Sequence, residues 1–352
     1  MGKGKIYEFE LFRFFAIVAV VLIHASSQGV GLLDRQSKIH VIFNFLNKIS
    51  LYAVPSFLFM SGVVLFYNYY AKWQLKDIIP FYAKRLKFIV VPYVVVSLFY
   101  YLFNQRLYYH TMTFNLSHFL SLLPWSKSGY HLYFIIIILQ FYVLFPVLLF
   151  LVKKFSFVQR YFTWIGIGLF LLFYFTNKYY YSFPHRTSLC FTYFAFFFLG
   201  ASIGMNYAKA LALIIKQRIW ISVCALITGL GASIPYILAD NHHFAPQYVY
   251  DFFFYTYGVF ASLFFLWLSY AIHQKFSKTS TVLQNIGSHS FGIYLIHPAL
   301  IGLYTMKIKA SGGSIAYLLY FIGAYLVAFG GAYLLTVLIK KFIKPYWVLI
   351  GK

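Results

Sequence analysis

The residues best suited to chemistry lie in one apolar stretch, ELFRFFAIVAVVLIHASS, at residues 10–27. Arg13 stands near its start and His24 near its end. On an α-helix their separation is about three full turns and about 16 Å, so both side chains lie on one face at two depths. Glu10 lies on the same side and can pair with Arg13. A neutral imidazole can act as a general base near pH 7. The alternative is an arginine that reaches the interface and a histidine bonded to backbone.

A second group of polar residues occurs in SHSFGIYLIHP, residues 288–298. Ser290, Tyr294 and His297 stand at i, i+4 and i+7, which places them on one helix face. Pro298 has no N–H, so we expect a loosened helix and a freed carbonyl there. The face either binds substrate or belongs to a kinked helix whose histidine bonds that carbonyl.

A third histidine, His131, begins the apolar run HLYFIIIILQFYVLFP, residues 131–146. A histidine among tyrosines is also typical of an interfacial aromatic belt. With His24 and His297 it makes three histidines on three helices at similar predicted depth. This placement favours a shared polar cavity in which His131 contacts substrate.

The run FYAKRLKFIVVPY, residues 81–93, concentrates positive charge at the mouth of another apolar stretch. Lys84, Arg85 and Lys87 suit a multiply charged phosphate and would form a cationic rim together with Arg13. A generic basic cluster on the cytoplasmic side explains the same pattern.

No metal site is expected. The loop at residues 240–251 carries Asp240, His242, His243 and Asp251. Adjacent histidines cannot easily face one ion, and the spacing matches no ligand motif. The sequence also lacks a Gly-rich phosphate loop, a GxSxG nucleophile turn and paired inward carboxylates.

The amino-acid composition shows whether these residues lie in water or in a membrane. The chain has 352 residues, of which 62% are hydrophobic and 10% charged, against roughly 25% charged in a soluble domain. This is the composition of a membrane protein, whose expected partner is the lipid bilayer. The net charge of +23 by itself fits nucleic-acid binding, but the basic residues are scattered between apolar runs, which excludes a nucleic-acid partner.

About ten apolar stretches can cross a hydrocarbon layer of about 30 Å, which predicts an all-α polytopic membrane protein. They are residues 9–30, 46–70, 88–104, 131–152, 161–176, 189–207, 219–239, 252–272, 284–305 and 315–339. With the amino terminus in the cytoplasm, the inner connections, including Lys3, Lys5 and Lys352, hold roughly twice the basic residues of the outer ones. Both termini are therefore predicted to be cytoplasmic.

The chain is expected to form a single domain, residues 1–352. Gly200 and Gly204 have the small-xxx-small spacing of packed membrane helices. Cys190 and Cys224 fall in different spans and are predicted to be thiols.

These elements describe a route from a cytosolic phosphate-bearing donor to a site deeper in the membrane. Acyl-coenzyme A fits this route, because its phosphates would stay at the basic rim while the flexible pantetheine arm carries the thioester inward. His24 would then take the proton of an acceptor hydroxyl, which is typically worth ~10² to 10⁴ in rate. Acyl-CoA is thus expected as a donor substrate, with no permanently bound cofactor.

The motifs resemble those of the acyltransferase 3 family of integral membrane acyltransferases. Arg13-x10-His24 with the preceding acid resembles its first-helix signature, KRLKFIVVPY its basic motif, YHLYF its His-Leu-aromatic-Phe segment, SFGIYLIHP its Ser-x3-Tyr-x2-His motif, and FFFLGASIGMN another recurrent stretch. Size and the absence of a fused soluble domain look most like the intercellular-adhesion C type proteins of biofilm polysaccharide operons. Glu10 stands where the family often has Asp, and the basic motif mixes Lys and Arg.

The resemblance implies O-acylation, with acetyl or alternatively succinyl, of a cell-surface polysaccharide or its lipid-linked precursor at the bacterial plasma membrane. It implies catalytic and donor-positioning roles for Arg13 and His24, with Glu10 as the partner of Arg13. The residues that it implies in substrate binding are His131, Tyr294 and His297.

Two other functions remain open. Ten helices with inner and outer polar regions would also suit an exporter or flippase of a biofilm polysaccharide such as poly-N-acetylglucosamine. The third possibility is a structural partner of a glycan synthase. A passive exporter should tolerate His24→Gln, and a structural partner should tolerate changes of both Arg13 and His24.

Overall fold

The computed structural model describes residues 6–310 and 315–351, and every regular element within these ranges is a helix. The prediction of an all-α protein is confirmed. Lys3, Lys5 and Lys352, which count toward the predicted cytoplasmic side, lie outside the described residues. The side of the membrane on which each connection lies stays a prediction.

The molecule is a polytopic membrane protein. Within the described residues, seven helical segments are long and apolar enough to cross a bilayer, and two bent pairs of helices raise the number to nine. The seven are Glu8–Leu32, Lys38–Tyr69, Leu75–Tyr109, Tyr133–Lys154, Arg218–Asp240, Gln247–Lys275 and Ala316–Phe342. The bent pairs are Cys190–Met205 with Tyr207–Lys216, at 108°, and Ser277–Ser288 with Ser290–Lys307, at 66°.

The described residues thus support seven to nine spans, slightly fewer than the predicted count of about ten. The expected span at residues 161–176 does fold as a helix, α9 (Phe162–Tyr179), but it is not among the segments apolar enough to cross. Its last turns carry Thr176, Asn177 and Lys178, which shorten the apolar part of the helix.

The chain divides into two compact units, each described here by itself. Unit 1 comprises Met1–Phe57 and Lys209–Leu338, and unit 2 comprises Leu58–Ala208 and Ile339–Lys352. Each unit thus combines an earlier and a later part of the chain. The predicted single domain over residues 1–352 remains a prediction.

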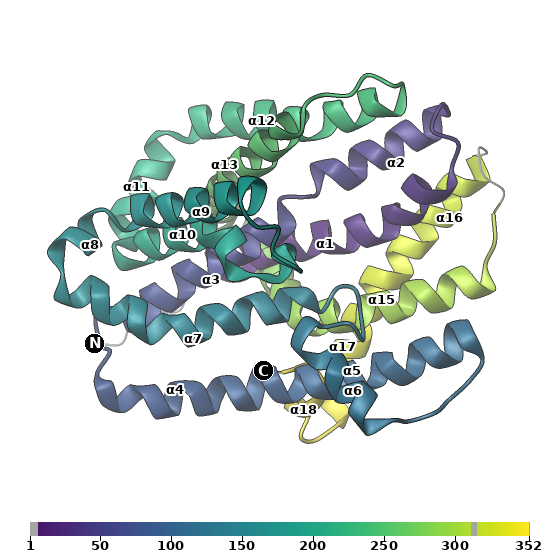
Figure 1. Ribbon diagram of the computed structural model, residues 1–352, viewed down its shortest axis with the longest axis horizontal. Helices are drawn as coiled ribbons and strands as arrows, with labels where there is room; N and C mark the ends of the chain where they lie inside the picture. Colours follow the sequence, from purple (N-terminus) through teal and green to yellow (C-terminus); the bar gives the residue numbers. More distant parts are fainter. Residues whose placement is uncertain (1–5, 311–314, 352) are drawn as a thin grey trace. The chain divides into compact units, whose positions relative to one another are not determined.

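Unit 1 is organised around its first helix, α1 (Glu8–Leu32). Its other elements are α2 (Lys38–Ile49), the start of α3 (Ala53–Tyr69), most of α11 (Tyr207–Lys216), α12 (Arg218–Asp240), α13 (Gln247–Lys275), α14 (Ser277–Ser288), α15 (Ser290–Lys307), α16 (Ile315–Leu326), η7 (Val327–Gly331) and part of α17 (Ala332–Phe342). Helix α1 packs against α2, α13, α14, α15, α16 and η7, and α2 and α16 can be followed beside it in Figure 1. Its apolar residues are accordingly buried on several sides, which fits a helix that is hydrophobic all round.

Unit 2 is built from shorter helices around a cluster of phenylalanines. Its elements are the rest of α3, η1 (Leu75–Asp77), α4 (Ile78–Arg85), η2 (Leu86–Val90), α5 (Val91–Asn104), η3 (Gln105–Tyr109), α6 (Leu116–Leu122), η4 (Leu123–Trp125), α7 (Tyr133–Lys154), α8 (Ser156–Arg160), α9, η5 (Arg186–Ser188), η6 (Cys190–Tyr193), α10 (Phe194–Met205) and α18 (Trp347–Ile350). The segment from η1 to η3 is one helical stretch with π-helical turns at η2 and η3. Turns of this kind occur often at functional sites.

The predicted role of two glycines in helix packing is confirmed in unit 2. A Cβ on Gly200 would lie 2.0 Å from the carbonyl oxygen of Phe59, and one on Gly204 would lie 2.3 Å from that of Val63. Helices α10 and α3 thus meet backbone to backbone. Cys190 and Cys224 are free thiols, as predicted.

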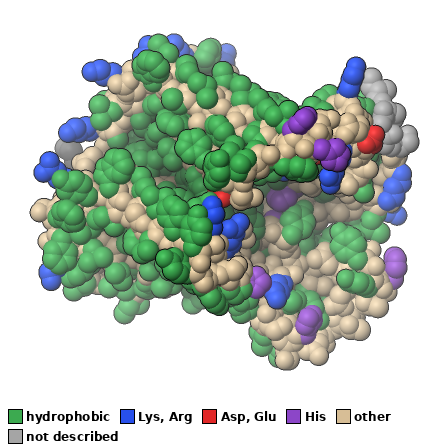
Figure 2. All heavy atoms as spheres, turned by 45° about the horizontal axis from the view of Figure 1, so that its top comes forward, with side chains coloured by type: hydrophobic (Ala, Val, Ile, Leu, Met, Phe, Trp, Pro, Cys, Tyr) green, Lys and Arg blue, Asp and Glu red, His purple; other side chains and the backbone are tan. Residues whose placement is uncertain are grey.

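The surface fits a lipid environment. Apolar side chains cover much of the face in Figure 2, and basic side chains are scattered among them. Many large hydrophobic residues are exposed on membrane-spanning segments, among them Val143, Val147 and Phe150 on α7 and Leu226 on α12. Such patches on a monomer mark contact with lipid or another apolar partner.

The close approach of α10 and α3 predicts that Gly200→Ala destabilises unit 2. Overpacking typically costs about 1–3 kcal/mol, and here the obstacle is backbone that cannot rotate away. We expect a lower midpoint when thermal unfolding of the purified protein is followed by fluorescence.

Gly168→Ala in α9 is the matched control, because a Cβ there meets nothing within 4 Å. Alanine is also the better helix former by about 1 kcal/mol, so the midpoint should hold or rise. Equal midpoints for the two variants would contradict the packing described.

Candidate functional site

The predicted pair at the start of α1 is present. An Nη1 of Arg13 donates to Oε2 of Glu10 at 3.1 Å, with the Arg13 side chain 34% exposed and that of Glu10 17% exposed. A Cβ on Gly287 of α14 would lie 1.8 Å from the carbonyl oxygen of Glu10, so only glycine fits there. This contact fixes the turn that carries the ion pair against α14.

At the other end of α1, His24 meets His297 of α15. The centroids of the two imidazole rings are 5.2 Å apart, with an angle of 33° between their planes. His24 is half-buried and His297 is fully buried. Tyr294 lies one turn earlier on α15, its ring centroid 6.3 Å from that of His297. The two histidines, which the sequence placed at similar depth, are thus neighbours in unit 1.

The hydrogen bond of His297 assigns its neutral tautomer. Its Nδ1 lies 3.0 Å from the carbonyl oxygen of Ile293. A carbonyl only accepts, so Nδ1 carries the proton and Nε2 carries the lone pair when the ring is neutral. The carbonyl of Tyr294, which Pro298 frees, also bonds the His297 ring, so the alternative of a histidine bonded to that carbonyl stays open.

Pro298 does not break its helix, although its missing N–H frees the Tyr294 carbonyl as expected. Helix α15 continues through Pro298, and the 66° bend occurs at His289, between α14 and α15. A proline inside a membrane helix is tolerated where neighbouring groups satisfy the freed carbonyl. Ser290 therefore begins a new helix directly after the bend. It shares the buried side of α15 with Tyr294 and His297.

Helix α2 contributes polar residues that the sequence analysis did not identify. Asn47 donates from Nδ2 to the carbonyl oxygen of Ile23, at 2.9 Å, and to Oγ of Ser26, at 3.1 Å. Both acceptors flank His24 on α1. Tyr320 of α16 donates to Oε1 of Gln28 at 3.0 Å, one turn further along. These bonds hold the C-terminal half of α1 from two sides.

The same face of α2 also binds the carboxylate at the end of α12. His40 Nε2 lies 2.9 Å from Oδ2 of Asp240, and Asn44 donates to the same oxygen at 2.6 Å. The spacing of His40, Asn44 and Asn47, at i, i+4 and i+7 in an apolar helix, is the signal that could have found them. Asp240 is thus bound by α2.

Within the described residues no group of three or more His, Cys, Asp or Glu is placed to hold a metal ion.

The three basic residues of the KRLK motif differ in their surroundings within unit 2. The guanidinium of Arg85 lies 4.1 Å from the ring centroid of Phe81 and donates to the hydroxyl of Tyr69 at 3.3 Å. Lys84 and Lys87 are exposed, and Lys87 Nζ lies 4.7 Å from the ring centroid of Trp347. The motif lies inside the long helical segment from η1 to η3, directly before the apolar residues 88–104 that it was expected to precede. Whether it joins Arg13 of unit 1 stays a prediction.

His131 lies in unit 2, just before α7. It is 1% exposed, and its ring meets that of Tyr100 edge to face at a centroid distance of 4.8 Å. Its predicted place in one cavity with His24 and His297 stays a prediction, because those residues belong to the other unit.

Unit 1 therefore offers a cation, Arg13, near the start of α1. Near the end of α1 it offers two imidazoles, His24 of α1 and His297 of α15. An arginine held by a carboxylate keeps a fixed position and can still bind a phosphate through its other N–H groups. A neutral imidazole can accept a proton from a hydroxyl. This is the chemistry of moving a group from a charged carrier to an alcohol.

Comparison with known proteins gives the same class of chemistry. The sequence model of the acyltransferase 3 family, described as an acyltransferase domain, matches residues 6–337. A protein of Staphylococcus epidermidis named "Probable poly-beta-1,6-N-acetyl-D-glucosamine export protein" is 28% identical over 319 residues, which cover 86% of this chain and 82% of that protein. A protein of the same name from Staphylococcus aureus (strain MSSA476) is 25% identical over 295 residues, covering 81% and 77%. No solved structure gives a significant match.

The family match begins before Glu10, ends after α15 and includes the basic motif of unit 2. The resemblance found in the motifs, including the likeness to polysaccharide export proteins, is thereby confirmed. The chain belongs to the acyltransferase 3 family of integral membrane proteins.

Proposed function

We propose that this protein is an O-acyltransferase that moves an acyl group from cytosolic acyl-CoA to a hydroxyl of a cell-surface polysaccharide or its precursor. The observation that carries the proposal is the contact of His24 with His297, two imidazoles on apolar helices of an acyltransferase family member. Buried polar residues in membrane helices are costly and are usually kept for function. The bacterial plasma membrane is the proposed location.

The proposed reaction is direct transfer. His24 takes the proton of the acceptor hydroxyl while the oxygen attacks the thioester carbonyl. The carbon–sulfur bond then breaks, and coenzyme A leaves with the proton returned from the imidazolium. His297, with its Nδ1 proton fixed on Ile293, presents a lone pair at Nε2 and helps to orient the neighbouring groups. No permanently bound cofactor is needed.

The proposed donor site uses the cations. Arg13, positioned by Glu10, would bind the diphosphate or the carbonyl groups of the pantetheine arm, and Lys84, Arg85 and Lys87 would bind the other nucleotide phosphates. The lysines are exposed and can reach a ligand, whereas Arg85 is half-buried among aromatic rings. The acyl group proposed is acetyl, with succinyl as the alternative.

The proposed acceptor is a polysaccharide, in view of the relatives named for export of poly-β-1,6-N-acetylglucosamine. Ser290, Tyr294 and His297 on α15 and His131 before α7 are the proposed acceptor contacts. A glycan synthase is a further proposed partner, since acylation would follow or accompany polymer synthesis.

Export is a second candidate function, because the names of the relatives favour it. A passive exporter needs neither a thioester site nor a base. The two functions therefore differ in their demand for an acyl-CoA site and for His24.

The donor site predicts the following binding pattern. Arg13→Ala should weaken binding of acetyl-CoA and free coenzyme A by about ten- to a hundredfold, the worth of a hydrogen bond to a charged group. His24→Ala should bind both ligands nearly as the wild type does. Isothermal titration calorimetry on purified protein measures both.

Arg160→Ala, at an exposed arginine of α8, is the control for general loss of positive charge. A wild type that binds neither acetyl-CoA, succinyl-CoA nor coenzyme A would reject the donor site and favour export.

An experiment in cells distinguishes acyl transfer from export. In a strain carrying His24→Gln we expect an unchanged amount of surface polysaccharide with a reduced content of alkali-labile ester, because only the acylation step needs the base. Polysaccharide is weighed and released acetate or succinate is measured by chromatography. Unchanged amounts of both surface polysaccharide and ester would instead favour a passive exporter, which tolerates His24→Gln.

A further inference from the structure

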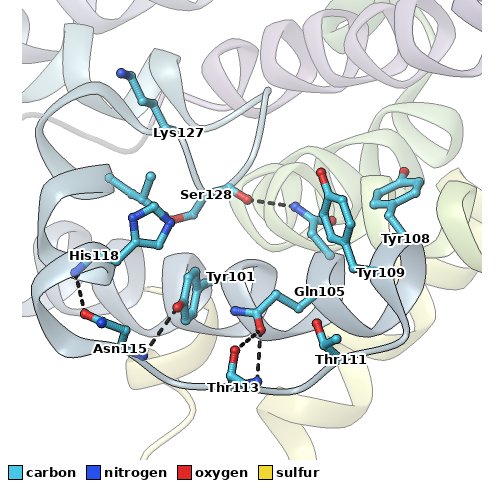
Figure 3. A pocket seen from close by; sticks show the side chains of 12 residues that line it. Tyr101, Gln105, Tyr108, Tyr109, Thr111, Thr113, Asn115, His118, Lys127 and Ser128 are labelled. Carbon is cyan, nitrogen blue, oxygen red and sulfur yellow. Dashed lines mark hydrogen bonds between the residues drawn. The ribbon is translucent and has the colours of Figure 1, made fainter.

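Unit 2 contains a pocket of about 690 Å³ that no residue of the proposed transfer reaction lines. It lies between the end of the long helix, at α5 and η3, and the following residues 111–128. Figure 3 shows Tyr101 and Gln105 between His118 on one side and Tyr109 on the other. The volume falls within the range of about 300–1,000 Å³ typical of ligand sites. The predicted topology puts this part of the chain on the outer side.

The chain holds the pocket open by its own hydrogen bonds. Gln105 Oε1 accepts from the backbone N–H of Thr113 at 2.9 Å and from its hydroxyl at 3.1 Å. His110, at a positive φ of 55°, turns the chain from the π-helical turn η3 into the extended segment that follows. Asn104 donates to the carbonyl oxygen of Ser128 at 2.9 Å, which ties the far side of the loop to α5. These hydrogen bonds therefore fix the wall of the pocket.

The lining combines aromatic rings with neutral polar groups. Three tyrosines contribute rings, three side-chain amides and three hydroxyl residues contribute donors and acceptors, and Lys127 contributes one positive charge. Gln105 uses only Oε1 within the described residues, which leaves its amide NH₂ to donate. Ser128 is 3% exposed, and its Oγ makes no hydrogen bond to any described residue.

This lining excludes several classes of ligand. No carboxylate lines the pocket, so it does not suit a metal ion or an amine. A phosphate would call for several cations or an open helix end. The pocket has one lysine, and the first turn of α6 is already capped by Oδ1 of Asn115, which accepts from His118 N–H at 2.9 Å. Sugar hydroxyls and acetamido groups, which both donate and accept, match the amides and hydroxyls, and their apolar faces match tyrosine rings.

We propose that this pocket is a carbohydrate-binding site that takes an uncharged or acidic glycan segment, such as an N-acetylated one, and disfavours a glycan with free amino groups. The selectivity follows from Lys127, because an ammonium group beside it meets a like charge with no carboxylate to offset it. The site goes beyond the proposed function. Transfer and export both handle a glycan, so it holds whichever of them is correct.

Binding of defined oligosaccharides tests the site without an acyl donor. The full chain is reconstituted in lipid nanodiscs, since maltoside detergents carry sugar headgroups of their own. β-1,4- and β-1,6-linked N-acetylglucosamine trimers should bind, as measured by saturation-transfer NMR and calorimetry. The corresponding glucosamine trimers, with protonated amines, should bind at least about tenfold more weakly.

Matched variants locate the binding. Tyr109→Ala should weaken binding of the acetylated trimers about tenfold through the lost stacking surface. Tyr180→Ala, at a tyrosine 86% exposed and outside the pocket, should bind like the wild type. Lys127→Glu, at an exposed position, should shift the preference toward the glucosamine trimers by a comparable factor.

Three results would overturn the proposal. They are no binding of any acetylated trimer, equal weakening by Tyr109→Ala and Tyr180→Ala, or an unchanged preference in Lys127→Glu. None of them bears on acetyl-CoA binding, so a failure here is distinct from a failure of the proposed acyl transfer.

Discussion

The structure of unit 1 depends on how one apolar helix, α1, satisfies the polar groups it carries. Arg13 bonds Glu10 on the same helix, and His24 meets His297 of α15. Asn47 of α2 bonds the backbone beside His24. A charged side chain in an apolar span costs at least ~2.5 kcal/mol, and neutral polar groups there also need partners. Satisfying these groups therefore requires α2, α14 and α15 to pack around α1, which is the arrangement observed.

The same requirement gives the helix its chemical capacity. The Glu10 carboxylate fixes Arg13 without using all its donors, and the Ile293 carbonyl fixes the proton of His297 on Nδ1. Groups held in one geometry lose little freedom when a substrate binds, which is how positioned side chains lower a barrier. The interactions that stabilise α1 thus also position the cation and the two imidazoles that the proposed transfer reaction uses.

Local patterns in the sequence predicted local features well. The pairing of Glu10 with Arg13 and the buried face of α15 follow from helical periodicity, and the similar depth of His24 and His297 is consistent with their contact. The bend at His289 was missed because residues 284–305 were read as one continuous span across the polar run at 288–290. The bond between His40 and Asp240 was missed because 200 residues separate them and the pattern of α2 was read only for its apolar residues. The pocket near Gln105 depends on a wide helical turn and a loop, for which hydrophobic periodicity gives no signal.

The most direct test of the central claim is transfer of radiolabelled acetyl from acetyl-CoA to a cell-surface polysaccharide by the purified protein in proteoliposomes, compared between the wild type and His24→Gln. We predict label in the wild-type product and a rate lower by ~10² to 10⁴ in His24→Gln at saturating donor, the usual worth of a general base. A His24→Gln protein that transfers at the wild-type rate would contradict the account, as would a wild type that binds acetyl-CoA yet labels no polysaccharide.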